Sequence, residues 1–303
     1  MAKSKGPTTK DFFRRFPTDD ACLDHLLEVR YGRESHCPKC GAETKWYRVR
    51  KEPSYACKWC GWHIHPMAGT PFERTRTPLQ FWFLAMFMFT TTRNGVSAKE
   101  VQRLTGVTYK TAWRMGHEIR KYMGWVDGDA PMGGPDKIVE IDKAFIGGAD
   151  KRGQDDKYVV LGIIERGGEV LTRHIPSRHE REVLPHIAKY VKRGTRVSTD
   201  EAKAFMNLGQ YGYRHGTVNH SIKEYVRGPI HTNTIENFWL WMKKSISGTH
   251  VSVSGKHLPK YLGEFEFRYN LRHTPTAMFD LLLTAFVKPG PSASPAADPA
   301  PSA

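Results

Sequence analysis

Four of the five cysteines in this chain stand in two matched pairs, and their spacing constrains the fold more than any other feature. Two residues separate Cys37 from Cys40 and Cys57 from Cys60, and sixteen residues lie between the pairs. A glycine follows each pair and permits the left-handed backbone of a tight turn. Two such turns present four thiolates, the closed tetrahedral set of a structural zinc ion. The sequence therefore predicts a zinc ribbon, with Cys22 left over as a small core residue.

Basic and aromatic side chains are interleaved around these pairs. They are Lys39, Lys45, Arg48, Arg50, Lys51 and Lys58, with Trp46, Tyr47, Tyr55, Trp59 and Trp62. The combination suits a nucleic-acid surface, and it equally suits the core of a small metal domain. The net charge of +15 favours a polyanionic partner for the chain as a whole.

With 303 residues the chain is long enough for two or three domains. Its longest apolar run lies within Leu79–Phe89, too short to span a membrane, and the first residues show no hydrophobic signal region. We therefore expect a cytoplasmic, nucleoid-associated protein with no membrane partner.

Changes in pattern along the chain predict six segments. These are an N-terminal helical segment (1–30), the zinc ribbon (31–72), a helix-turn-helix (73–126), a linker (127–136), an α/β domain (137–287) and a disordered tail (288–303). The α/β assignment rests on strands that alternate with helices after residue 137. The expected strands are 138–146, 158–164, 169–175 and 196–199, and the expected helices are 180–191, 234–247, 256–271 and 276–287.

The helix-turn-helix prediction rests on helix punctuation. Ser97 and Glu100 form a capping box, Gly106 makes the turn, and Thr108 caps a second helix. That helix would present basic residues to a DNA groove, while the alternative is an ordinary helical hairpin. The expected DNA contacts are Lys110, Arg114, His117, Arg120 and Lys121, and the expected inward residues are Ala112, Trp113, Gly116 and Ile119.

Three acidic residues stand where an α/β domain would bring them together. Asp142 lies inside an expected strand, Asp200 follows another, and Glu236 lies in an expected helix that Asn233 could cap. A charged residue within a buried strand needs a reason, and three converging carboxylates could hold two divalent ions for phosphoryl displacement. Taken singly, each acid could equally be solvated, and Asp200 could simply cap a helix. Glu140, which shares a strand face with Asp142, is the strongest competitor.

The spacing carries a resemblance to a known family. Thirty-five residues separate Asp200 from Glu236, and Lys243 follows seven positions after Glu236. This resembles the D,D-35-E signature, with its trailing lysine, of the transposase and retroviral-integrase superfamily. The layout over about residues 15–285 is similar to that of the bacterial insertion-sequence 1595 transposases. The matching pieces are CPKCG and CKWCG, GVSAKEVQRLTGVTYKTAWRM, EIDKAFIGG, STDEAKAF and HTNTIENFWLWMKKSISGTH.

The resemblance implies an RNase H-like catalytic domain with two Mg²⁺ or Mn²⁺ ions held by Asp142, Asp200 and Glu236. It implies cleavage and strand transfer at the terminal inverted repeats of an element, and a homodimer or larger assembly that pairs two ends and target DNA. Lys243 and Lys244 would contact DNA beside the metals, and His231 could contact the scissile phosphate. The alternatives are a DNA-binding regulator with an inactive domain, a nuclease that only hydrolyses and, more remotely, an RNA-binding ribbon protein.

Overall fold

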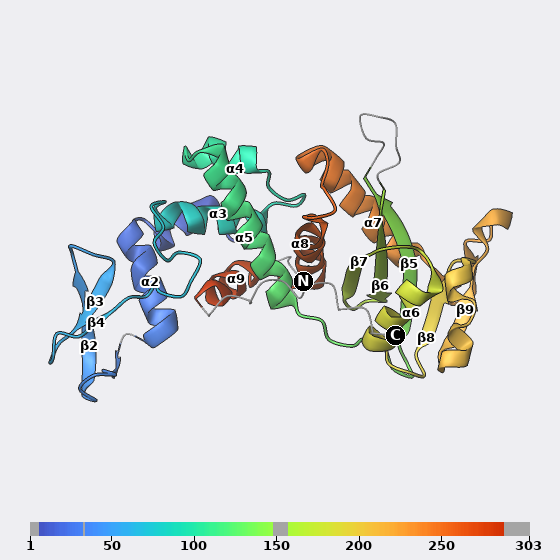
Figure 1. The fold of residues 1–303 in the computed structure, drawn as a ribbon, viewed down its shortest axis with the longest axis horizontal. Coiled ribbons are helices and arrows are strands. Elements are labelled where there is room, and N and C mark those ends of the chain that lie inside the picture. Colours follow the sequence, from blue (N-terminus) through green and yellow to red (C-terminus); the bar gives the residue numbers. More distant parts are fainter. Residues whose placement is uncertain (1–5, 33, 148–156, 288–303) are drawn as a thin grey trace. The chain divides into compact units, whose positions relative to one another are not determined.

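A computed structural model of the chain describes residues 6–32, 34–147 and 157–287. The chain divides into two compact units, Met1–Val126 with Thr274–Ala303, and Asp127–His273 (Figure 1). The expected disordered tail, 288–303, and the polar loop that contains Asp150, Asp155 and Asp156 lie outside the described residues. In the part of the chain described, no helix is long and apolar enough to cross a membrane.

The first unit begins with two short helices and a four-stranded ribbon in the order β1-β2-β3-β4. The elements are α1 (Thr9–Arg15), α2 (Asp19–Tyr31), β1 (Glu34–His36), β2 (Glu43–Val49), β3 (Ser54–Cys57) and β4 (His63–Ile64). Burial alternates along β2, so Trp46 points inward while Tyr47 is exposed. Tyr55 is also buried, whereas Trp59 and Trp62 are exposed. The aromatic residues of this segment are thus divided between the core and the surface.

Four helices complete this unit: α3 (Leu79–Thr91), α4 (Ala98–Thr105), α5 (Tyr109–Asp127) and α9 (Met278–Phe286). Ser97 caps α4 by accepting from the Glu100 N–H, and Gly106 ends that helix with a φ of 72° that suits glycine. The Glu100 carboxylate bonds to Arg103, so the cap is the single Ser97 bond. The two helices predicted for this segment are present.

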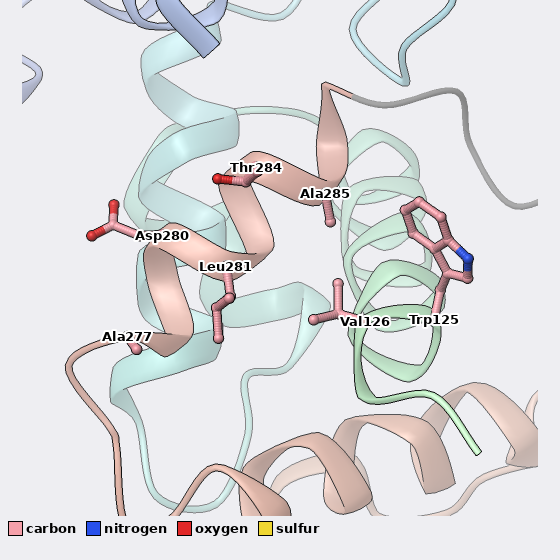
Figure 2. A pocket seen from close by; sticks show the side chains of 7 residues that line it. All are labelled: Trp125, Val126, Ala277, Asp280, Leu281, Thr284 and Ala285. Atoms are coloured by element: carbon pink, nitrogen blue, oxygen red, sulfur yellow. The ribbon is translucent and has the colours of Figure 1, made fainter. Parts of the chain in front are cut away.

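Helix α9 packs with the first unit, which differs from the predicted boundary of 137–287 for one α/β domain. The reason lies in its aromatic side chains, since Phe279 contacts Phe12 and Phe87, while Phe286 contacts Phe72 and Tyr122. A mostly apolar pocket of about 480 Å³ lies between α9 and the end of α5. Figure 2 shows Leu281 and Ala285 of α9 on the side of that helix nearest Val126 and Trp125.

The second unit is built on a five-stranded mixed sheet in the order β7-β6-β5-β8-β9 (Figure 1). Its strands are β5 (Ile138–Ile146), β6 (Tyr158–Glu165), β7 (Val170–Ile175), β8 (Arg196–Thr199) and β9 (Arg214–Thr217). Strands β5, β6 and β7 are antiparallel neighbours, while β8 runs parallel to both β5 and β9. The α/β fold class expected for this part of the chain is confirmed.

Helices and short turns surround the sheet. They are α6 (Glu180–Tyr190), η1 (Lys203–Phe205), η2 (Leu208–Tyr211), η3 (His220–Ile222), α7 (Asn233–Ser245), η4 (Ile246–His250) and α8 (Leu258–Asn270). A two-stranded hairpin, β10 (Val226–Arg227) and β11 (Ile230–His231), precedes α7.

Successive side chains of β5 point to opposite faces of the sheet, and the core of this unit therefore has two layers. Val139 and Ile141 belong to the layer that includes Val183 and Ile187 of α6. Ala144 and Ile146 belong to the layer formed with α7 and α8. Even-numbered β5 residues therefore face α7, and this places Glu140 and Asp142 on the face that carries the third acid.

The segment expected to be a linker, 127–136, is in part an edge of the second unit. The Met132 N–H donates to the Tyr190 carbonyl at 2.9 Å, and the Met132 side chain is buried in the α6 layer. Gly134 N–H bonds to Thr195 Oγ1 at 2.9 Å. This segment is therefore tied to the sheet at several points.

Candidate active site and metal centre

Strand pairing brings Asp142 and Asp200 to neighbouring positions. In the parallel ladder Ile141 of β5 is opposite Thr199 of β8. Asp142 directly follows the first of these residues and Asp200 directly follows the second. Ligands commonly gather at the carboxyl ends of parallel strands. Asp200 Oδ1 accepts from the Ala202 N–H at 3.1 Å, a local contact of the kind expected if Asp200 caps the turn that follows it. That contact occupies one oxygen and leaves Asp200 beside Asp142.

Glu236 reaches the site from the first turn of α7. Its Oε1 atom accepts a hydrogen bond from Thr232 Oγ1 at 2.6 Å. His220 Nε2 lies 3.7 Å from the same oxygen. The carboxylate of Glu236 is thus oriented by two side chains that sequence reasoning did not single out.

Trp239 fixes α7 against β5. Its Nε1–H donates to Asp142 Oδ2 at 3.0 Å, and its indole belongs to the apolar layer on that side of the sheet. Gly162, which pairs with Asp142 across the β5–β6 ladder, makes room for it. A Cβ at Gly162 would lie 2.4 Å from Trp239 Cζ2. The lack of a side chain at Gly162 therefore lets the helix carrying Glu236 approach Asp142.

The pKa of Asp142 reports the electrostatic state of the site. Burial, together with the negative charges of Asp200 and Glu236, raises this pKa to about 6, and the Trp239 hydrogen bond limits the rise. Asp142 therefore interacts electrostatically with the other two carboxylates, and the neighbouring Lys143 interacts with both aspartates. Hard oxygen donors of this kind suit Mg²⁺ or Mn²⁺.

Glu140, close to the three acids, has a structural role at the start of α7. It is fully buried, and its Oε2 accepts from the N–H groups of Thr234 and Ile235 at 2.8 and 3.1 Å. Its Oε1 accepts from Thr234 Oγ1 at 2.8 Å and from Arg166 Nε at 2.6 Å. Glu140 thus caps the helix that carries Glu236, whereas the expected cap, Asn233, is the first helical residue.

His231 belongs to the same network. Its Nδ1 lies 3.2 Å from Glu140 Oε1, and its carbonyl accepts from Arg166 Nη2 at 3.0 Å. The expected contact of His231 with the scissile phosphate stays a prediction. Lys243 and Lys244, in contrast, are exposed in the last turn of α7.

The four cysteines of the two pairs converge as predicted. The Sγ atoms of Cys37, Cys40, Cys57 and Cys60 all lie within 4.8 Å of one another, and in the described ranges they are the one group of three or more potential ligands that is this tight. Four thiols at this spacing fit a tetrahedral zinc ion. The three candidate carboxylates, Asp142, Asp200 and Glu236, do not meet the same criterion. Cys22 is buried in α2, as expected.

Side chains of α5 differ in their exposure. Lys110 and Arg114 are exposed and Lys121 is partly exposed. His117 and Arg120 are buried, because Arg120 donates to the Val96 carbonyl at 2.9 Å and lies over the Phe89 ring. Their burial is at odds with the expectation of DNA contact. Ala112, Gly116 and Ile119 face inward as predicted, whereas Trp113 is exposed.

Comparison with known proteins bears on both units. Residues 132–270 match the model of the ISXO2-like transposase domain, and residues 17–63 match that of the transposase zinc-ribbon domain. The fold and the cysteine centre thus define a zinc-ribbon protein of the transposase class. Both models describe the insertion-sequence 1595 group and together they cover more than half of the chain, which belongs to this family.

Two relatives agree with this assignment. A protein in transposable element ISH50 of Halobacterium salinarum is 27% identical over 289 residues, which span 86% of this chain and 94% of the relative. A transposase-like protein of Haemophilus influenzae is 28% identical over 102 residues, which span 34% of this chain and 81% of the relative. The first similarity extends across both units.

Proposed function

We propose that the chain is a DNA transposase that cleaves the ends of an insertion sequence and joins them to target DNA. The observation that carries this proposal is the convergence of Asp142, Asp200 and Glu236 from two adjacent strands and one helix. Three mutually interacting carboxylates on an α/β sheet are suited to metal-dependent phosphoryl transfer. Membership of a transposase family supports the same class of reaction, phosphoryl transfer on DNA.

The reaction has two steps. Water first attacks the phosphodiester at the element end, and the bond to the 3′ oxygen breaks to leave a 3′ hydroxyl. That hydroxyl then attacks a target phosphodiester, forming one bond as another breaks. Neither step requires a covalent bond between protein and DNA.

Asp142, Asp200 and Glu236 would hold two Mg²⁺ or Mn²⁺ ions. When bound, the ions supply an activated water and stabilise the leaving oxygen. Trp239 holds Asp142 in place, and Thr232 and His220 orient Glu236. The Glu140 cap fixes the start of α7, so that the spacing of the three carboxylates is set before DNA arrives.

Exposed basic residues would bind the DNA backbone. On α5 these are Lys110 and Arg114, with the partly exposed Lys121, and on α7 they are Lys243 and Lys244. Phosphate contacts of this kind supply affinity and register rather than base specificity. The helix pair α4–α5 would act as a helix-turn-helix on terminal inverted repeats. A homodimer or larger assembly would pair two ends, an expectation that comes from the family.

The test is an assay of purified protein with DNA from both flanks of its gene, a supercoiled target and Mg²⁺ or Mn²⁺. Joined product identifies a transposase. Cleavage without joining would identify a nuclease instead, and tight binding without chemistry in either metal would identify a regulator. The variant Asp200→Ala is the matched control, because this change removes a carboxylate from the site and leaves both β8 and the DNA-binding surfaces intact.

A further inference from the structure

The segment His220–His231, called here the hairpin segment, exposes large side chains beside the carboxylates. It consists of η3, a turn and the β10–β11 hairpin. Ile222 is 72% exposed, Tyr225 53% and Val226 52%. Exposed apolar side chains that cluster in one segment commonly mark a binding surface.

The base of the hairpin segment is firmly held at both ends. At the start, the Glu201 carboxylate accepts from the N–H groups of His220 and Ser221 at 3.1 and 3.2 Å. Near the end, Arg166 donates to the carbonyls of Pro229 and His231 at 2.7 and 3.0 Å. Because the base is fixed, the exposed side chains of the tip keep a defined position relative to the active site.

His220 lies between Tyr225 and the carboxylate of Glu236. Its ring meets the His220 ring edge to face, with centroids 5.3 Å apart. His220 Nε2 in turn lies 3.7 Å from Glu236 Oε1. A DNA strand whose phosphate lies at the carboxylates would therefore pass within reach of the Tyr225 ring.

The charge of the hairpin segment matches such a strand. Lys223 and Arg227 flank Tyr225 and are both exposed. Glu224, the one acid of the segment, is partly buried and accepts from the Asn219 N–H at 3.4 Å. A tyrosine between two exposed cations is the combination that binds single-stranded nucleic acid, since the ring stacks on a base and the cations attract phosphates.

We propose that the hairpin segment binds one DNA strand beside Glu236, with Tyr225 stacked on an unpaired base and with Lys223 and Arg227 against backbone phosphates. Stacking needs a base whose own neighbour has been displaced, so the segment would select a frayed or single-stranded end over an intact duplex. This inference rests on the proposed function and adds the state of the DNA that the site accepts.

The experiment measures binding rather than cleavage. The probes are a duplex with a single-stranded 3′ overhang that carries 2-aminopurine, and a blunt duplex of equal length, with Ca²⁺ in place of Mg²⁺. Stacking of the probe base on Tyr225 quenches its fluorescence. We expect Tyr225→Ala to abolish the quenching and to weaken overhang binding about tenfold, with blunt-duplex binding unchanged. Tyr225→Phe should retain both properties because it keeps the ring.

The matched control is Tyr211→Ala, which removes a tyrosine of η2 that is 44% exposed and lies outside the hairpin segment. It should behave as wild type. Unchanged quenching in Tyr225→Ala would overturn the proposal, as would equal losses in the two alanine variants. Slower cleavage by Tyr225→Ala with full quenching would also overturn it, since the ring would then only orient His220. Failure of the wild type to cleave any DNA in Mg²⁺ would instead overturn the proposed function.

Discussion

The carboxylate of Glu140 accepts both the N–H and the hydroxyl of Thr234, at 2.8 Å each, and so ties the central strand of the sheet to the first turn of α7. Glu236 lies two residues further along that helix. The position of the third acid is therefore coupled to a residue that shares the strand face of Asp142. Glu140, a buried acid close to the three candidate carboxylates, thus supports the helix that carries one of them.

Glu140→Ala should lower both stability and activity. The change leaves Arg166 and the first N–H groups of α7 without their acceptor, and breaking a buried charged pair costs about 3 kcal/mol. We expect a lower unfolding temperature in calorimetry of the full chain and slower DNA cleavage, with DNA affinity unchanged. Glu140→Gln keeps an acceptor oxygen and should lose less. An alanine variant with wild-type melting and cleavage would refute this assignment.

Gly162→Ala should disturb the active site through Trp239. The added Cβ would lie 2.4 Å from Trp239 Cζ2, so the indole must move away from Asp142. Overpacking of this kind costs about 1–3 kcal/mol, and we expect a matching loss of stability in chemical denaturation together with reduced cleavage. Gly209→Ala is the control, because nothing lies within 4 Å of its Cβ position. Equal behaviour of the two variants would rule out this role for Gly162.

Stability should fall as the pH rises from about 5 to about 8, through the titration of two buried acids. Burial, with the charge of Glu266 added, raises the pKa of Asp127 to about 8, and burial raises that of Glu266 to about 7. Since both folded-state values exceed the ordinary carboxyl pKa, the folded chain binds protons that the unfolded chain has released. This contribution is complete at low pH and is lost as the pH passes the folded values.

The check on this pH dependence is Asp127→Asn, which keeps an oxygen to accept the Asn270 Nδ2–H hydrogen bond found at 2.9 Å. Its melting temperature should fall less steeply with pH than that of the wild type over the same range. Parallel curves for the two proteins would show that Asp127 does not titrate in this window.

Removal of one ribbon cysteine should release zinc. Cys57→Ser breaks the set of four thiols that lie within 4.8 Å of one another, and a structural site that loses one ligand loses its closed shell. Metal analysis should give one zinc per wild-type chain and a much lower content in the variant, with an early unfolding step. Cys22→Ala is the matched control and should leave zinc bound, because burial raises the pKa of the Cys22 thiol to about 12. Equal zinc in all three proteins would contradict the ribbon assignment.

Sequence patterns predicted several elements of the second unit closely. Strand β5 has the predicted bounds, and α6 and β7 differ by one residue at one end. Strand β9 escaped prediction because Arg214–Thr217 is polar and contains a glycine. Helix α9 groups with the first unit and not with the rest of the predicted 137–287 domain, because periodicity shows that a helix has a buried face but not which element covers it.

The three candidate acids could be predicted because each lies in or directly after an element that the sequence pattern indicates. Asp142 and Asp200 follow directly from strand positions, and Glu236 from its spacing. His220, Glu201 and Arg166 act across loops that meet only in the folded unit, and no local pattern marks them. Arg120 was expected to contact DNA, but it is buried, where it donates to the Val96 carbonyl and lies over the Phe89 ring. A long charged side chain can enter a core where a carbonyl and an aromatic ring contact it.

Asp142, Asp200 and Glu236 are proposed to form one metal-dependent centre for DNA cleavage and joining. The most direct measurement compares joined product from Asp142→Asn, Asp200→Asn and Glu236→Gln with that from wild type, in Mg²⁺ and in Mn²⁺. Each change removes a charge and keeps the side-chain shape. Our account predicts that each variant binds DNA as wild type does and yields less than about one hundredth of the product. Wild-type yield from any one of the three would contradict it.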